Sequence, residues 1–132
     1  REAENRLLQG GERQGTISEL APIFYDLQIL EMQDLVSKIH ASGPILEYVQ
    51  DLLEQTRKNG NFKSGLSPRA GLALLRTSKS WAFLQGRDYV IPEDVQAITA
   101  YIVRHRLSLK ESLPPDKHFE RIQDLVNQVP IP

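Results

Sequence analysis

The sequence predicts an all-α fold, a helical bundle of about four to six helices. Along most of the chain, apolar residues recur with the spacing of a helix that buries one face. Two helix starts are marked by proline, at Ser67-Pro68 and at Pro92-Glu93-Asp94. The alternation typical of strands is weak, and only Tyr89-Val90-Ile91 favours a short extended stretch.

The first 30 residues carry the weakest helix signals. Residues 1–9 predict part of a helix, and residues 10–30 fit at most a helical turn or two. The apolar residues behind these two predictions are Ala3, Leu7, Leu8, Ile17, Leu20 and Phe24. A clearer helix with one buried face follows, because four apolar residues have the spacing i, i+3, i+4 and i+7. These residues are Met32, Leu35, Val36 and Ile39.

The next helix has a cleaner apolar stripe over three turns. Its members are Ile45, Tyr48, Val49, Leu52, Leu53 and Thr56. Ser42 suits the N-cap and Pro44 the first turn. We expect this helix to end near Lys58, because Asn59-Gly60-Asn61 is typical of a turn.

A third helix is predicted from Ser67 to about Gln85, with Gly86 as the residue that ends it. Apolar side chains cover most of its circumference on a helical wheel, so we expect this helix to be the central one. Its polar stripe is narrow and contains Arg69, Arg76 and Ser80.

Two further helices are predicted after Pro92. In the first, His105 shares a face with Val95, Ile98 and Ile102, so we expect a partly buried, hydrogen-bonded histidine. Residues 108–116 form a linker, and Asp116 is the expected cap of the last helix. The apolar face of that helix consists of Phe119, Ile122, Leu125, Val126 and Val129.

Composition excludes several classes of function. The 132 residues, 40% hydrophobic and 25% charged, suffice for one globular domain. The absence of cysteine excludes zinc fingers, disulfide frameworks and thiol nucleophiles. The three histidines, His40, His105 and His118, are far apart in sequence, so we expect no metal site. No apolar run approaches the roughly 20 residues of a membrane span. None of the glycines sits in a phosphate-loop pattern, so we expect no ATP hydrolysis by this chain alone.

Charge is distributed unevenly. Residues 1–50 carry 4 basic and 8 acidic side chains, and residues 111–132 carry 2 and 4, whereas residues 51–110 carry 10 basic and 5 acidic ones. The cationic middle is typical of a solvated face or of a surface that meets phosphate. One alternative function, a nucleic-acid-binding helical module, therefore stays open. A second alternative is a histone-fold-like dimerisation subunit, which the long third helix, the extended link at Tyr89-Val90-Ile91 and the helix start at Pro92-Glu93-Asp94-Val95 resemble. Nucleic acid is the weaker interpretation, because the basic residues are not gathered on one recognition helix.

The most specific feature is the block Gly65-Leu66-Ser67-Pro68-Arg69-Ala70. Together with four further blocks in order, it resembles the C-terminal lid of MoxR-type AAA+ ATPases. Those blocks are Trp81-Ala82, Gly86-Arg87-Asp88-Tyr89-Val90, Pro92-Glu93-Asp94-Val95 and His105-Arg106-Leu107. Shorter likenesses lie at Arg1-Glu2-Ala3-Glu4, from Tyr48 to Arg57, and at Val129-Pro130-Ile131-Pro132.

The resemblance implies that residues 1–132 are a single lid domain of a longer, cytoplasmic protein. The core that binds ATP and Mg²⁺ would lie upstream, and neighbouring subunits would complete a ring. Arg69 matches the second sensor, the lid arginine that reaches the γ-phosphate, with Ser67, Pro68 and Arg76 in support. The family resembles chaperones that assemble or activate other protein complexes, and the client is not visible in these residues.

The chemistry of a helix start agrees with that role for Arg69. A guanidinium at the second helical position lies beside unpaired backbone N–H groups and the positive end of the helix dipole. An anion would satisfy the arginine and the helix terminus together. One residue departs from the family pattern: Ile91 stands where the family often has a capping threonine, a loss of about 1 kcal/mol of helix stability.

Overall fold

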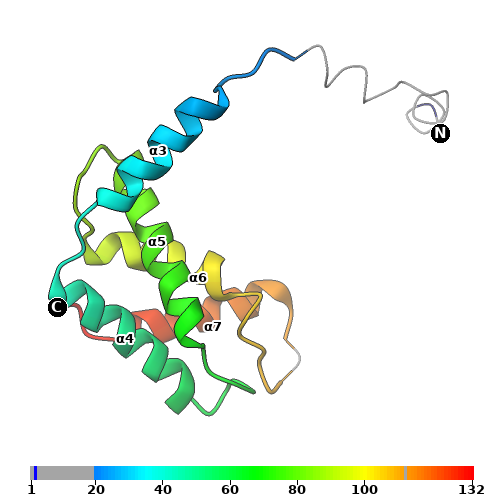
Figure 1. Cartoon of the computed structure of the whole chain (residues 1–132). Coiled ribbons are helices and arrows are strands. Elements are labelled where there is room, and N and C mark those ends of the chain that lie inside the picture. Colours follow the sequence, from blue (N-terminus) through cyan, green and yellow to red (C-terminus); the bar gives the residue numbers. More distant parts are fainter. Residues whose placement is uncertain (1, 3–19, 112) are drawn as a thin grey trace. The chain divides into compact units, whose positions relative to one another are not determined.

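The computed structural model describes residues 2, 20–111 and 113–132. Those residues contain five helices, which confirms the predicted all-α fold (Figure 1). The helices are α3 (Asp26–Lys38), α4 (Gly43–Lys58), α5 (Pro68–Leu84), α6 (Pro92–Val103) and α7 (Pro115–Gln128). The chain divides into two compact units, Arg1–Glu31 and Met32–Pro132. Most of the helix predicted at residues 1–9, with Ala3, Leu7 and Leu8, lies outside the described residues, as does Ile17.

In the first unit, the described residues 20–25 precede a helix and are not helical themselves. The helical turn predicted around Leu20 and Phe24 is therefore wrong for these two residues. The helix begins one residue after Tyr25, whose backbone N–H donates to Gln28 Oε1 at 2.9 Å. This side-chain bond satisfies a donor that has no partner within the first helical turn.

The helix predicted from Met32 to Ile39 is confirmed as the second half of α3, but its buried face is not. Met32 and Val36 are half-buried, Leu35 is 49% exposed, and only Ile39, just beyond the helix, is buried. The apolar spacing predicted the helix correctly. It overestimated how much of this face the described residues cover.

Helices α4 to α7 form the bundle in the second unit (Figure 1). Among them, α4 and α6 contact each other and both α5 and α7, and α5 contacts α4 and α6. Lys79 of α5 also donates from its Nζ to the carbonyl of Ser37 in α3 at 3.1 Å. The buried face predicted for α4 is confirmed at all of its positions: Ile45, Tyr48, Val49, Leu52, Leu53 and Thr56. Ser42 is the N-cap and Asn59 the C-cap, so both predicted ends are also confirmed.

The helix starting at Ser67 packs against both α4 and α6, but only one of its faces is buried. The buried stripe of α5 is narrow and consists mainly of small residues: Ala70, Gly71, Leu74, Ser78 and Ala82. Small side chains let α5 approach its neighbours closely. The large apolar residues Leu72 and Leu84 instead point outward and are 59% and 72% exposed. The helical wheel counted these residues as buried because it has no information on which face meets the neighbours.

Two predictions at the helix ends are also wrong. His105 lies beyond the end of α6 and is exposed, with its Nε2 accepting a bond from Arg106 Nε at 3.0 Å. The chain turns after Val103, so His105 leaves the face that a longer helix would have given it. Asp116 is not the cap of α7, because the helix already begins at Pro115 with Pro114 in the N-cap position. Proline suits the first helical position, and Asp116 lies in the first turn.

Two short backbone pairings tie the loops of the second unit together. A parallel bridge joins His40 to Tyr89, with hydrogen bonds of 2.8 and 2.9 Å that involve Asp88 and Val90. It confirms the extended stretch predicted there. An antiparallel bridge joins Phe62 to Leu109 and connects the loop before α5 to the segment between α6 and α7.

We expect Tyr48→Phe to leave the free energy of unfolding unchanged or to raise it by up to about 1 kcal/mol. The Tyr48 hydroxyl is buried and has no hydrogen-bond partner among the described residues. Burial raises the pKa of Tyr48 above its ordinary value of 10.0. Above about pH 10 the unfolded chain therefore ionises this tyrosine first, and the native protein loses stability that the variant keeps. Urea unfolding at pH 7 and pH 10.5 measures both effects. A clearly lower free energy of unfolding for the variant at pH 7 would contradict the first expectation.

Candidate functional site

Arg69 lies at the second position of α5 and is exposed, as predicted. It forms no ion pair with another described residue. Ser67 is the N-cap, with its backbone extended and its Oγ accepting from the N–H of Ala70 at 3.4 Å. Pro68 occupies the first position and has no N–H to satisfy. The backbone N–H of Arg69 is left without a described acceptor, so both it and the guanidinium of Arg69 are available to an anion.

The loop before α5 is fastened to the last turn of α4 through Leu66. The N–H of Leu66 donates to Thr56 Oγ1 at 2.9 Å, and the same hydroxyl donates to the carbonyl of Leu53 at 2.7 Å. The carbonyl of Leu66 accepts from Arg57 Nε at 3.1 Å. Both polar groups of this buried residue are thus satisfied by two consecutive residues of α4. We call these three contacts the Leu66 clamp.

Gly65 allows the clamp to form, because the backbone of the loop passes directly over Arg57. A Cβ atom on Gly65 would lie 2.7 Å from the Cα and 2.9 Å from the backbone N of Arg57. Such contacts with backbone cannot be relieved by turning a side chain, so only glycine fits at this point. Below the loop, Leu66 packs in a core cluster with Phe62 and Ala70.

Arg76 is also exposed, on the same helix seven residues after Arg69. Seven residues are close to two helical turns, so both arginines lie on the same face of α5. The exposed Leu72 lies between them along that face, and the backbone carbonyl of Arg76 accepts from Ser80 Oγ at 3.1 Å. The face can thus present two guanidinium groups to an extended anion, with Arg69 at the helix terminus.

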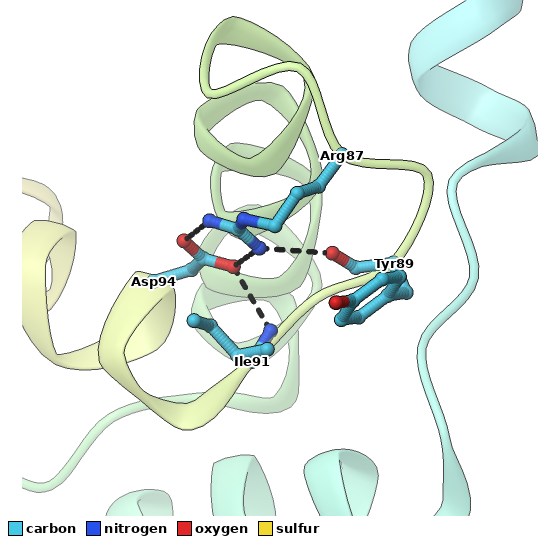
Figure 2. Close-up of polar contacts among 4 residues, drawn as sticks. All are labelled: Arg87, Tyr89, Ile91 and Asp94. Atoms are coloured by element: carbon cyan, nitrogen blue, oxygen red, sulfur yellow. Dashed lines mark hydrogen bonds and ion pairs between the residues drawn. The ribbon is translucent and has the colours of Figure 1, made fainter.

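The other end of α5 is held by an ion pair between Arg87 and Asp94, whose side chains are 22% and 2% exposed (Figure 2). Arg87 Nη1 donates to Asp94 Oδ2 at 2.7 Å and to the carbonyl of Tyr89 at 3.0 Å, and Nη2 contacts Asp94 Oδ1. The guanidinium also lies 6.0 Å from the centre of the Tyr89 ring. The hydrogen bond to Asp94 raises the pKa of Arg87 above its usual value, so the guanidinium stays charged. We call these contacts the Arg87–Asp94 lock.

The described part of the chain contains no group of three or more histidine and acidic side chains placed to hold a metal ion. Among the same residues, no helix has both the length and the apolar character needed to cross a membrane.

The comparisons with known proteins identify the domain. A family model described as the AAA lid domain matches residues 54–129, more than half of the chain. This chain belongs to the AAA lid family. The match contains α5, α6 and α7 whole. It also contains both hydrogen bonds of Leu66 and the Arg87–Asp94 lock, so these features belong to the lid.

Relatives of the lid include MoxR proteins. YeaC of Bacillus subtilis, an uncharacterised protein, is 32% identical over 112 residues, which cover 85% of this chain and 34% of the relative. Chaperone MoxR1 of Mycobacterium tuberculosis is 30% identical over 112 residues, which cover 74% of this chain and 30% of the relative. The lid therefore spans about a third of the length of these curated relatives.

A solved structure shares the fold of the lid over its whole length. The crystal structure of a candidate ATPase from Cytophaga hutchinsonii matches with a TM-score of 0.74 at 25% identity. The match covers 100% of this chain and 43% of that chain. The predicted identity, a C-terminal lid of MoxR type, is confirmed by these matches.

The structure adds residues that reasoning from the sequence had not assigned. Asp94 stood out in the sequence only as part of a helix start, yet it is 2% exposed and also accepts the N–H of Ile91 at 2.9 Å. This bond takes over at the position where Ile91 lacks a capping hydroxyl. The sequence contained a signal for it, an acidic residue three positions after the N-cap. The sequence contained no such signal for Thr56 and Arg57. Their bonds go to Leu66, which lies ten and nine positions away in a loop.

We expect Gly65→Ala to lower the free energy of unfolding by about 1–3 kcal/mol, because the added methyl would collide with the backbone of Arg57. Gly60→Ala is the matched control, since a Cβ at Gly60 meets nothing within 4 Å. We expect its effect to stay within about 0.5 kcal/mol. Urea unfolding of both variants decides the point, and equal stabilities would show that the loop can move away from α4.

We expect Asp94→Asn to lower the melting temperature by on the order of 5 °C or more, because the partly buried guanidinium of Arg87 loses its counter-ion. Glu93→Gln removes the same charge from the neighbouring, exposed residue and should shift the melting temperature by much less. Thermal unfolding followed by circular dichroism compares the two. Equal shifts would mean that only the dipole interaction at the start of α6 matters.

Proposed function

We propose that this chain is the nucleotide-sensing lid of a MoxR-type AAA+ ATPase with a chaperone-like role in the assembly or activation of other protein complexes. The observation that carries the proposal is the exposed Arg69 beside its own unsatisfied backbone N–H at the start of α5. Arginine at such a place suits the terminal phosphate of a nucleotide, since its planar fork donates two parallel hydrogen bonds to phosphate oxygens.

In this proposal the nucleotide and its Mg²⁺ are held by an ATPase core elsewhere in the full-length, cytoplasmic protein. The lid alone does not hydrolyse ATP. With ATP in the core, Arg69 contacts the terminal phosphate and the lid closes, and after hydrolysis the contact is lost and the lid relaxes. A charged contact present in only one nucleotide state is what a two-state switch requires. The relatives that support a core are about three times longer than the lid.

The wider role rests on the relatives. One of them is named a chaperone, and another, from Methanocaldococcus jannaschii, is named a magnesium-chelatase subunit homologue. We propose that neighbouring subunits form a ring in which closure of one lid repositions the next subunit. The client is a protein complex of unknown identity.

In the full-length ATPase, we expect Arg69→Ala to lower kcat by about 10-fold or more, because the transition state loses a charged donor. Arg69→Lys should have a kcat between those of the wild type and Arg69→Ala, since lysine keeps the charge and lacks the planar guanidinium. Arg121→Ala is the matched control, an exposed arginine of α7 with no ion pair to another described residue. Steady-state ATP turnover measures all three, and unchanged kcat in Arg69→Ala would refute the sensor role.

A further inference from the structure

We propose that Thr56 and Arg57 are positioning residues for Arg69, so that the last turn of α4 sets the direction in which the sensing arginine points. The proposal rests on the proposed function and adds two residues to it. Neither residue lies on α5. Their connection to Arg69 runs through the Leu66 clamp and the three residues that follow it.

The clamp fixes the orientation of one peptide residue from both sides. Packing in the core can hold the Leu66 side chain in place, but it does not determine the direction of the backbone that leaves it. The bond from the Leu66 N–H to Thr56 and the bond from Arg57 to the Leu66 carbonyl determine that direction. The two bonds therefore supply an orientation that burial alone cannot.

Little freedom remains between the clamp and the arginine. Ser67 is held in an extended conformation with φ −78° and ψ 160° by its role as N-cap. Pro68 has a φ fixed by its ring, and Arg69 is already helical. A rotation of the Leu66 peptide therefore turns the first turn of α5 and the arginine with it.

The contact between α5 and α4 does not rest on the Leu66 clamp alone. The packing of α5 on α4 is already close at Gly71, where a Cβ would lie 2.7 Å from Leu53 Cδ1. Arg57 is exposed, and its one described hydrogen bond goes to Leu66. An exposed arginine that uses its inner nitrogen on a loop carbonyl is better explained by control of that loop than by burial of apolar surface.

A contact between a guanidinium and a phosphate depends strongly on position. A displacement of about 1 Å at a reacting group can lower a rate by as much as about a hundredfold. Loss of the clamp should therefore reduce ATP turnover even though the nucleotide remains bound by the core. A role limited to stability would lower the melting temperature and leave kcat unchanged at temperatures where the variant is folded.

The test uses the full-length ATPase with Thr56→Val, Arg57→Met, Arg69→Ala, and each of the first two combined with Arg69→Ala. Valine keeps the shape of threonine without the hydroxyl, and methionine keeps the stem of arginine without the donor. Thr56→Ser keeps the hydroxyl and serves as the rescue variant. Lys58→Met is the control for Arg57→Met, because Lys58 is the next residue and pairs only with Glu54 among the described residues. Turnover is measured well below every melting temperature.

We expect Thr56→Val and Arg57→Met each to lower kcat by about tenfold with little change in the KM for ATP. Thr56→Ser and Lys58→Met should remain near the wild-type value. Each double variant should be no slower than Arg69→Ala alone, because without the arginine there is nothing left to position. If Thr56→Val does not fold, the comparison of Arg57→Met, Arg69→Ala and their double variant decides, because Arg57 is exposed.

The alternative outcomes are distinct. Normal kcat in Arg57→Met and folded Thr56→Val, with a slow Arg69→Ala, overturns the positioning role and leaves the sensor role standing. Losses that multiply in the double variants show that α4 acts independently of Arg69, which also overturns the proposal. Normal kcat in Arg69→Ala refutes the proposed function, and the positioning role with it.

Discussion

The hydrogen bonds from Leu66 to the last turn of α4 hold the start of α5 against α4. The Thr56 hydroxyl is buried, so its two hydrogen bonds have no competition from water. Each group left unsatisfied there would cost about 1–3 kcal/mol, a large fraction of the stability of a small domain. Glycine at position 65 is a condition of the same contact, because the loop passes too close to Arg57 for any side chain. The position of the helix start against α4, and with it the position of Arg69, follows from these contacts.

The far end of α5 is held by a different kind of interaction. The helix ends at Leu84 and turns at Gly86, which has a positive φ of 73° that glycine adopts without strain. One residue later, Arg87 reaches Asp94 and so joins the end of α5 to the start of α6. A buried ion pair need not add stability compared with apolar residues, but its paired geometry allows few alternatives. Hydrogen bonds thus fix both ends of a helix whose outer face is exposed.

Local signals in the sequence predicted most of this fold, and long-range contacts account for the errors. The apolar stripe and caps of α4, and the Ser67-Pro68 start of α5, depend on neighbours within a few residues and were predicted correctly. The burial of α5 was overestimated, because a wheel does not show that small residues such as Ala70 face the core while Leu72 faces outward. The position of Arg69 could be predicted from its helix start. The partners of Leu66 could not, because they depend on a loop folding back onto α4.

The attachments of α5 at both ends bear on how a lid can respond to a single charged contact. A helix held at one end could rotate locally when its first turn binds an anion, and the movement would fade within a turn or two. Because α5 is joined to α4 at its start and to α6 at its end, a displacement of Arg69 is transmitted to both α4 and α6. Closely packed helices shift as bodies and do not deform gradually. A sensing arginine at the start of α5 would therefore move the second unit as a whole, which is the response that a lid requires.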